Sequence, residues 1–186
     1  MPLYEIGDAG ESLYSVRRGL VKLYQFLPNG DQRVVRLLKP GDIAGLELLV
    51  DSSYHHSAMT THKSDVCRIP VRTILELETR YPVLYKNLML RWQASLDEAD
   101  RFITLFSTGT SQVRMARLLF EMQKAENLAW GSHLNREDMG DILGISTETA
   151  SRIIAEFKRR GLISETRNEL AFNDPDALES ISRDEK

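Results

Sequence analysis

The sequence predicts an α+β protein in which an N-terminal β-roll is followed by a long helix and a C-terminal winged helix-turn-helix. Three observations predict this order. Short strand-like segments fill residues 1–70, apolar residues then recur every third or fourth position, and two helical segments joined by a glycine turn precede a hairpin. We expect a β-roll domain over 1–80, a long helix over 81–107 and a winged helix-turn-helix domain over 108–186.

The first seventy residues alternate between strand-like and turn-like segments. Segments 13–16, 21–26 and 33–38 are rich in aromatic and β-branched residues, and the turn at 28–31 joins the last two as a hairpin. After a second turn at 39–42, two more short strands are expected at 57–61 and 66–69. Strands punctuated in this way favour a small barrel or roll.

After the roll, the apolar residues recur every three or four positions, which is the spacing of a helix. Residues 71–78 fit a short helix that ends before Pro82, and Pro82 suits the first turn of a longer helix. So long an apolar stripe indicates a dimer seam; the alternative is a helix packed lengthwise on its own roll. The proposed dimerisation residues are Leu88, Trp92, Leu96, Ala99, Ile103 and Phe106.

The C-terminal part has the signals of two helices joined by a tight turn. A break at 107–110 is followed by an amphipathic helix over 113–126 and a loop. Asn135 suits the N-cap of the next helix, with acidic residues in its first turn. Gly144 suits the left-handed position at the end of that helix, and Ser146 suits the N-cap of the following one. The spacing predicts a helix-turn-helix.

The second helix of this pair has two chemically different faces. Glu148, Ser151 and Arg152 share the outward face, near the start of the helix, where a recognition helix reaches base edges. Arginine suits guanine O6 and N7, and glutamate accepts from a cytosine amine, so we expect these three side chains to read bases. The residues expected in the core are Ala150, Ile153, Ile154 and Phe157.

A hairpin is expected after this helix. Segment 161–172 is typical of a helix end and two short strands turning near Asn168, with Arg167 at the tip, which makes the module a winged helix. Short hydroxyl side chains at the helix start and a basic wing tip suit contacts with phosphate. The residues expected to contact phosphate are Ser146, Thr147, Thr149 and Arg167.

Charge indicates a local rather than a global contact with nucleic acid. The chain has 24 Lys and Arg against 27 Asp and Glu, with a net charge of −3. Residues 146–167 carry five basic and three acidic side chains, whereas 168–186 carry two and six. A cytoplasmic protein is expected, because there is no apolar stretch of membrane-spanning length or secretion signal, and Cys67 is the single cysteine.

Five motifs occur in one order along nearly the whole chain. They are Gly-Asp-Ala-Gly-Glu-Ser-Leu-Tyr at 7–14, Gly-Leu-Val-Lys-Leu-Tyr at 19–24, Lys-Pro-Gly-Asp-Ile-Ala-Gly at 39–45, Val-Arg-Met-Ala-Arg-Leu-Leu at 113–119 and Leu-Gly-Ile-Ser-Thr-Glu-Thr-Ala-Ser-Arg at 143–152. Together they resemble the cyclic-AMP receptor and fumarate-nitrate regulator superfamily, called Crp/Fnr. The resemblance implies a cyclic-nucleotide-binding-like β-roll in a homodimeric transcription regulator, with double-stranded DNA and RNA polymerase as partners.

The recognition helix resembles that of the fumarate-nitrate branch, which carries glutamate, serine and arginine at the spacing of Glu148, Ser151 and Arg152. The cyclic-AMP receptor type instead has arginine where Thr147 stands and glycine where Ser151 stands. The resemblance therefore implies a palindrome with half-sites close to TTGAT, spaced by one helical turn.

The effector is the least defined part of the resemblance. Cyclic-nucleotide members carry Arg-Ser where this chain has His56-Ser57, so cyclic AMP is not expected. One cysteine cannot hold the iron–sulfur cluster of oxygen-sensing members. Haem ligation by His55, His56 or His62 stays open, with solvated histidines as the alternative. The candidate effector-pocket residues are Gly45, Glu47, His56 and Ser57.

Two other functions are alternatives to a DNA-binding regulator. A cupin-like metalloenzyme needs a His-x-His pair facing inward, whereas adjacent His55 and His56 on a strand point to opposite faces, so no enzyme and no metal site are expected. A small-molecule-binding or protein-docking roll with vestigial DNA binding is the remaining alternative. Family members normally have a helix and a strand before the turn near Gly7, so we expect a short member or a truncated start.

Overall fold

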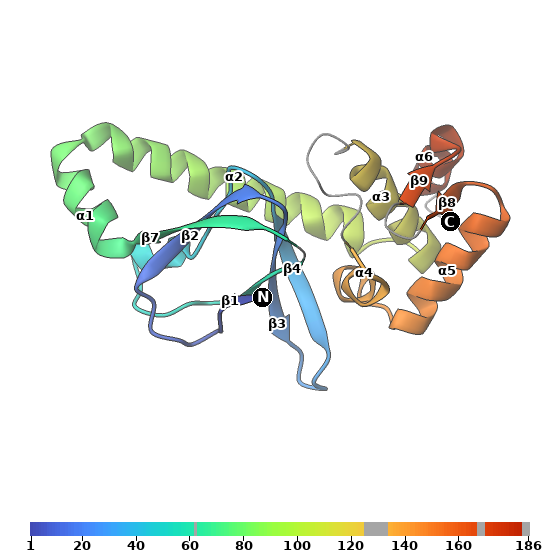
Figure 1. Ribbon diagram of the computed structural model, residues 1–186, viewed down its shortest axis with the longest axis horizontal. Helices are drawn as coiled ribbons and strands as arrows, with labels where there is room; N and C mark the ends of the chain where they lie inside the picture. The colour runs from blue at the N-terminus through green and yellow to red at the C-terminus, as the bar shows by residue number, and fades with distance from the viewer. Residues whose placement is uncertain (62, 125–133, 167–169, 184–186) are drawn as a thin grey trace. The chain divides into compact units, whose positions relative to one another are not determined.

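The computed structural model describes residues 1–61, 63–124, 134–166 and 170–183. These residues form two compact units, Met1–Asp100 and Arg101–Lys186. The order of elements is a set of strands, a long helix, a helix-turn-helix and a hairpin (Figure 1). The predicted α+β class, with a roll, a long helix and a winged helix-turn-helix, is therefore confirmed.

The first unit begins with a roll of two antiparallel sheets. Its strands are β1 (Pro2–Tyr4), β2 (Ser12–Arg18), β3 (Val21–Phe26), β4 (Gln32–Leu38), β5 (Ile43–Ala44), β6 (Ser57–Thr60) and β7 (Asp65–Pro70). The strand orders are β1-β6-β3-β4 and β5-β2-β7. The five expected strands are present. Strands β1 and β5 were not expected from the sequence, because strands of three and two residues are too short to show an alternating pattern.

Inward side chains of both sheets fill one apolar core. Val16 and Ala58 are almost fully buried in it, and the Tyr4 ring stacks on the Tyr54 ring with 3.6 Å between centroids. The expected hairpin joins β3 to β4, and Gly30 in its turn has a φ of 87°, which glycine adopts without strain. The roll is thus a packed body that can hold a rigid cavity wall.

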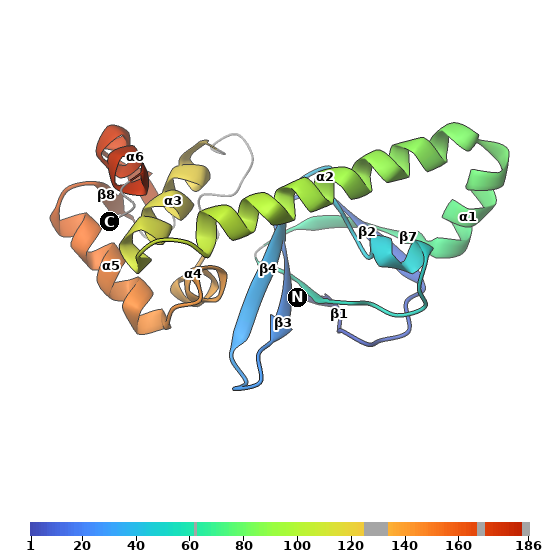
Figure 2. The ribbon, with the colours of Figure 1, turned by 180° about the vertical axis from the view of Figure 1, so that it is seen from behind.

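Two helices complete the first unit and lead into the second. They are α1 (Val71–Arg80) and α2 (Pro82–Phe106), and Pro82 begins α2 as predicted. Leu88 of α2 packs with Leu13 and with Leu46, which starts the one-turn 3-10 helix η1 (Leu46–Leu49). One face of α2 therefore lies on the roll, and Figures 1 and 2 show the helix running along its side.

The α2 helix also has an exposed apolar face. Leu96 and Ile103 are 52% and 59% exposed. Leu88 and Phe106, which the sequence analysis placed in the dimerisation set, are only 7% and 3% exposed and are buried within the protomer. Helical spacing groups residues by angle, but it does not say which apolar face meets the protein's own core, and the predicted set mixed two faces. The half-buried members of the set are Trp92 and Ala99.

The second unit contains the end of α2 and the helix-turn-helix module. Its elements are α3 (Ser111–Lys124), α4 (Arg136–Leu143), α5 (Thr147–Arg159), β8 (Ile163–Glu165), β9 (Leu170–Phe172) and α6 (Pro175–Arg183). The α6 helix packs on α3 and was not expected from the sequence. The expected wing tip at Arg167 and Asn168 lies outside the described residues. Among the described helices, none is long and apolar enough to cross a membrane.

Candidate nucleic-acid interface

The turn between α4 and α5 has the geometry expected from the sequence. The Asn135 side chain accepts from the Asp138 N–H at 2.8 Å, and Gly144 ends α4 with a φ of 62°. Ser146 Oγ accepts from the Thr149 N–H at 3.2 Å and so caps α5. The two predicted N-caps and the predicted left-handed glycine are confirmed.

Gly140 of α4 allows the backbone of the turn to lie close to the helix, a role that was not expected from the sequence. A Cβ on Gly140 would lie 2.7 Å from the Ile145 carbonyl oxygen. The Ile145 N–H donates to the Gly140 carbonyl at 3.1 Å, so the turn is held directly against α4. A glycine inside a helix just before a turn is the signal that could have revealed this contact.

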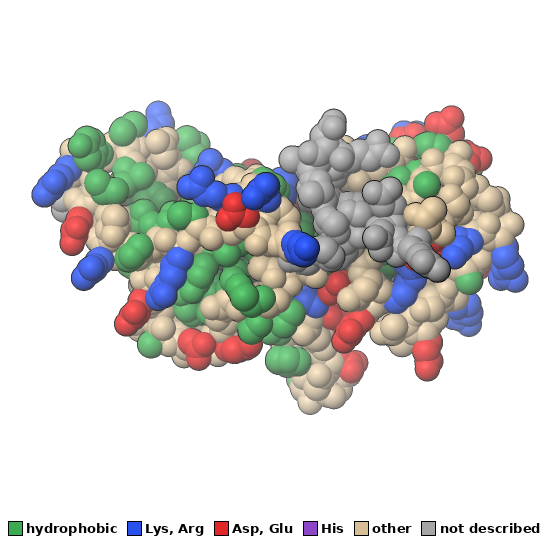
Figure 3. Space-filling view, viewed as in Figure 1, with side chains coloured by type: hydrophobic (Ala, Val, Ile, Leu, Met, Phe, Trp, Pro, Cys, Tyr) green, Lys and Arg blue, Asp and Glu red, His purple; other side chains and the backbone are tan. Residues whose placement is uncertain are grey.

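The two faces of α5 are separated as predicted. The outward side chains of Glu148, Ser151 and Arg152 are exposed, and none has a hydrogen-bond or ion-pair partner among the described residues. Figure 3 shows basic side chains gathered around α5. An acceptor, a hydroxyl and a planar donor are therefore free on one helix face. The buried face consists of Ala150, Ile153, Ile154 and Phe157.

The hydroxyl side chains around the start of α5 are not equivalent. Ser146 Oγ donates to Thr149 Oγ1 at 3.0 Å while it caps the helix, so its proton is used locally. Thr147 is exposed and Thr149 is half-buried. The Thr149 hydroxyl accepts from Ser146, which leaves its own proton for another acceptor. Arg167, the fourth residue expected at phosphate, lies outside the described part of the chain.

Side chains of α3 contact both helices of the helix-turn-helix. Arg114 donates to the Leu143 carbonyl at the end of α4 and to Ser111 Oγ at 3.4 Å. Gln112 donates to Glu156 of α5 at 2.8 Å. The sequence indicates only that this helix is amphipathic, because long-range contacts of polar side chains leave no periodic signal. These contacts tie α3 to the end of α4 and to α5.

The hairpin is anchored by an ion-pair network around Glu165 of β8. Arg136 Nη2 of α4 lies 2.6 Å from one carboxylate oxygen, and Lys158 Nζ of α5 lies 3.1 Å from the other. Burial raises the pKa of Glu165, but the Lys158 hydrogen bond and the positive charges outweigh burial, so the pKa lies below its ordinary value. The hairpin is therefore tied to both helices of the helix-turn-helix.

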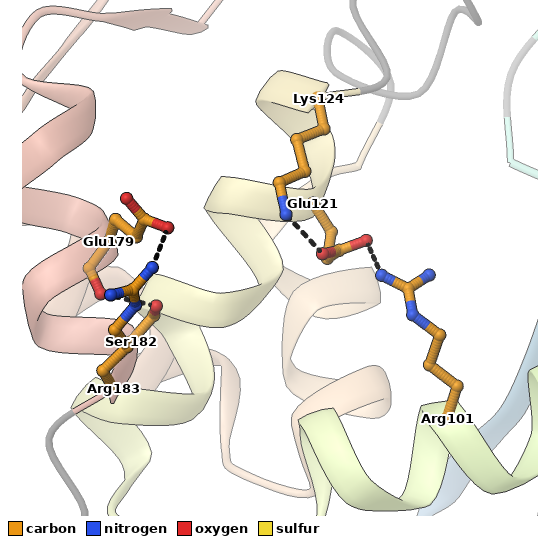
Figure 4. Close-up of polar contacts among 6 residues, drawn as sticks. All are labelled: Arg101, Glu121, Lys124, Glu179, Ser182 and Arg183. Atoms are coloured by element: carbon orange, nitrogen blue, oxygen red, sulfur yellow. Dashed lines mark hydrogen bonds and ion pairs between the residues drawn. The ribbon is translucent and has the colours of Figure 1, made fainter.

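Basic side chains also connect the end of α2 to the module. Arg101 of α2 pairs with Glu121 of α3, whose other oxygen lies 3.7 Å from Lys124 (Figure 4). Arg117 of α3 donates to the Thr108 carbonyl at 3.0 Å and to the Ser182 carbonyl of α6 at 2.9 Å. The last residues of α2, the link after it and α6 are thereby held on one helix.

The predicted effector residues meet at a cavity in the first unit, with one exception. Gly45, Glu47 and His56 line a cavity of about 150 Å³. Ser57 does not, because it is fully buried and its hydroxyl donates to Glu5 at 2.7 Å. His55 and His56 precede β6 in a bend and line the same cavity, so the expectation of opposite strand faces was wrong.

The contacts of the histidines and acidic residues bear on metal and haem ligation. The described part of the chain has no group of three or more His, Cys, Asp or Glu placed to hold a metal ion. His55 Nε2 lies 2.9 Å from Asp51 Oδ2, which occupies that ring nitrogen, and His62 lies outside the described residues. His56 Nδ1 is buried and makes no hydrogen bond with any described residue.

Two family models match the chain. The cyclic nucleotide-binding domain matches residues 2–81, and the Crp-like helix-turn-helix domain matches residues 113–181. The anaerobic regulatory protein of Pasteurella multocida is 25% identical over 186 residues, covering 97% of this chain and 68% of that protein. The fumarate and nitrate reduction regulatory protein of Escherichia coli K12 is 24% identical over 186 residues, covering 97% and 74%.

Solved structures share the fold along the whole chain. A Crp-family transcriptional regulator from Thermus thermophilus aligns with a TM-score of 0.85 at 22% identity and covers 99% of this chain and 94% of that one. FixK2 from Bradyrhizobium japonicum also aligns with a TM-score of 0.85 at 22% identity and covers 99% and 93%. With both domain models matched on one chain, it belongs to the Crp/Fnr family of transcription regulators and carries a DNA-binding helix-turn-helix.

Proposed function

We propose that the protein is a homodimeric regulator that reads a palindrome with half-sites close to TTGAT. The observation that carries the proposal is the free outward face of α5, where Glu148, Ser151 and Arg152 have no partner among the described residues. These side chains suit base edges in the major groove. Similarity to proteins named for fumarate and nitrate reduction supports the choice of half-site.

The proposed dimer seam is an apolar heptad stripe on α2 whose residues are exposed or half-buried. Its residues alternate in spacing of four and three, which is the a/d pattern of a two-stranded coiled coil. Leu88 and Phe106 leave the predicted set because they are buried in the protomer, and two exposed residues in register join it. The stripe consists of Tyr85, Met89, Trp92, Leu96, Ala99 and Ile103.

Phosphate contacts come from the hydroxyls and from basic side chains near α5. Thr147 is exposed at the first position of the helix, where its backbone N–H also faces outward. We assign phosphate contacts to Ser146, Thr147 and Thr149, and to Arg167 on the wing. In this arrangement the dimer presents two recognition helices to successive major grooves and recruits RNA polymerase beside them.

The test is binding of the full-length protein to a duplex carrying the palindrome, measured by fluorescence anisotropy. Arg152→Ala is expected to lose about 1–3 kcal/mol on the palindrome and to relax selectivity at one base position, because one bidentate contact is lost. Arg72→Ala is the matched control, since Arg72 is an exposed arginine on α1. Equal loss on palindrome and random duplex would contradict the base-reading role.

The same titration distinguishes the proposed regulator from the alternative, a small-molecule-binding or protein-docking roll with vestigial DNA binding. A functional DNA-binding domain loses affinity for DNA as the salt concentration rises, because its binding releases counterions from the DNA phosphates. Absence of saturable binding at low salt would favour the alternative. Transcription in vitro with purified RNA polymerase then tests recruitment, since a regulator that binds its site without changing transcript yield contradicts that partnership.

A further inference from the structure

The Arg117 side chain of α3 holds the corner at which α2 ends. Its Nη1 donates to the Thr108 carbonyl and to Thr108 Oγ1, both at 3.0 Å, and to the Leu105 carbonyl of α2 at 3.4 Å. Its Nε donates to the Ser182 carbonyl of α6 at 2.9 Å. One half-buried guanidinium therefore ties three segments of the described chain to α3: the end of α2, the link after it and the end of α6.

The link between α2 and α3, residues 107–110, is also hydrogen-bonded to both helices. At its start, Thr108 Oγ1 donates to the Thr104 carbonyl of α2 at 2.7 Å. At its end, Thr110 Oγ1 accepts from the Val113 N–H of α3 at 3.3 Å. The link is exposed, and an exposed segment without such bonds opens locally at little cost in free energy. These bonds make the link a fixed corner and not a swivel.

A second contact fixes the last turns of α2 on the same helix. Arg101 of α2 pairs with Glu121 of α3 (Figure 4), whose side chain is only 14% exposed. Salt screens a partly buried pair of this kind less than it screens a surface pair. Phe102 and Phe106, which lie along the same turns, are both buried. The end of α2 therefore belongs to the compact second unit, which begins at Arg101.

The proposed dimer seam reaches into this part of α2. Ile103, its last residue, lies two positions before Leu105, whose carbonyl Arg117 holds. In a dimer joined along α2, the direction in which α2 leaves the second unit sets the separation of the two recognition helices. Half-sites one helical turn apart are roughly 34–36 Å apart, and one added base pair moves a half-site by roughly 3.4 Å and turns it by roughly 35°. A fixed corner cannot follow that change without losing contacts.

We propose that Arg117 is a positioning residue that sets the half-site spacing which the dimer accepts. It acts through the corner at 107–110 and not through a contact with DNA. The α6 helix takes part, because its Ser182 carbonyl holds the Nε side of the guanidinium. This inference rests on the proposed dimeric regulator and assigns to it a residue for spacing, which is separate from the residues for base identity on α5.

The experiment compares the parent and Arg117→Gln, as full-length proteins, on a series of duplexes. The two half-sites stay constant, and the spacer between them is lengthened or shortened by one base pair at a time. A duplex with a single half-site measures one DNA-binding domain, and single-base changes in that half-site measure base selectivity. Arg183→Gln is the matched control, because Arg183 follows Ser182 on α6, is exposed, and pairs with Glu179 of its own helix.

The parent is expected to prefer one spacer sharply. Arg117→Gln is expected to reduce that preference by about 3- to 10-fold, which is the effect of one or two net hydrogen bonds. Its affinity for a single half-site and its base selectivity are expected to match the parent, because the outward face of α5 is unchanged. Arg117→Lys keeps the charge without the planar fork and should give an intermediate preference, and Arg183→Gln should keep the parent's preference.

Amide hydrogen exchange tests the corner without DNA. In Arg117→Gln, exchange of the amides in 107–113 is expected to be at least about 3-fold faster than in the parent, whereas exchange in α5 is expected to be unchanged. Thr108→Val is the second variant: it removes the exposed hydroxyl that accepts from Arg117, so it tests the corner even if Arg117→Gln fails to fold.

The outcomes separate this inference from the proposed function. If the parent prefers one spacer and that preference survives in every folded variant of Arg117 and Thr108, only the inference fails. An equal loss on every duplex, including the single half-site, would also overturn it, because such a loss indicates general destabilisation. A parent that binds all spacers equally would show that no fixed corner operates. If the parent binds no palindrome, the proposed function fails and the inference fails with it.

Discussion

A substitution at Gly140 tests the geometry of the helix-turn-helix most directly. Alanine is a better helix former than glycine by about 1 kcal/mol, so intrinsic propensity alone predicts that Gly140→Ala stabilises α4. The structure predicts the opposite. The new Cβ would lie 2.7 Å from the Ile145 carbonyl oxygen and 3.5 Å from the Thr147 nitrogen, both of which are backbone atoms.

The backbone of the turn cannot retreat without losing other contacts. The Ile145 N–H donates to the Gly140 carbonyl, and Ser146 caps α5 directly after it. Overpacking of this kind costs about 1–3 kcal/mol, and the gain in helix propensity offsets part of it. Because the clash is with backbone atoms, we place its cost at about 2–3 kcal/mol and expect a net loss of roughly 1–2 kcal/mol. For a unit of this size, each kcal/mol lowers Tm by about 4–8 °C.

The measurement is thermal unfolding of the full chain followed by circular dichroism, with DNA affinity measured on the same samples. Ala155→Gly is the control, because Ala155 is exposed on α5 and reports helix propensity without a contact. DNA affinity should fall in Gly140→Ala, since the start of α5 moves with the turn. A Gly140→Ala protein that is as stable as the parent, or more stable, would refute the close approach.

Three further changes test other parts of the molecule. Glu165→Gln should cost under about 1 kcal/mol at neutral pH. Because the folded pKa of Glu165 is lowered, the wild-type advantage is present above the ordinary pKa and disappears as pH falls through the folded value; a deficit in urea unfolding that persists in acid would contradict this. Ile103→Glu should give monomers in sedimentation, whereas Leu90→Glu, also 59% exposed but off the seam, should leave the dimer intact; monomers from both would disprove the seam. Arg159→Gln should make the slope of log affinity against log salt shallower by about 2 per dimer, at about 0.9 per phosphate, and an unchanged slope would show that Arg159 does not reach DNA.

Local rules predicted the helix-turn-helix best. Asn135, Gly144 and Ser146 act within a few residues of their own positions, so the sequence contains all the information that their caps need. The start of α6 had a similar signal that was missed: Asp174 Oδ1 accepts from the Ala177 N–H at 3.0 Å, and Pro175 occupies the first helical position.

Features that depend on distant packing could not be predicted in the same way. Which side of α2 meets the roll depends on Leu13 and Leu46, which lie far from Leu88 in the sequence. The direction of His55 and His56 depends on a bend that no alternating pattern marks.

Ion pairs of the basic side chains lower the positive charge that the helix-turn-helix can offer to DNA. Counting residues gives a positive segment around α5, yet Lys158 is paired with Glu165, and Arg160 lies 3.9 Å from Glu156. Among the described residues of α5, Arg152 and Arg159 are the basic side chains without such a partner. The charge available for DNA is therefore smaller than the sequence count, and more of the selectivity must come from the directional groups at the start of the helix.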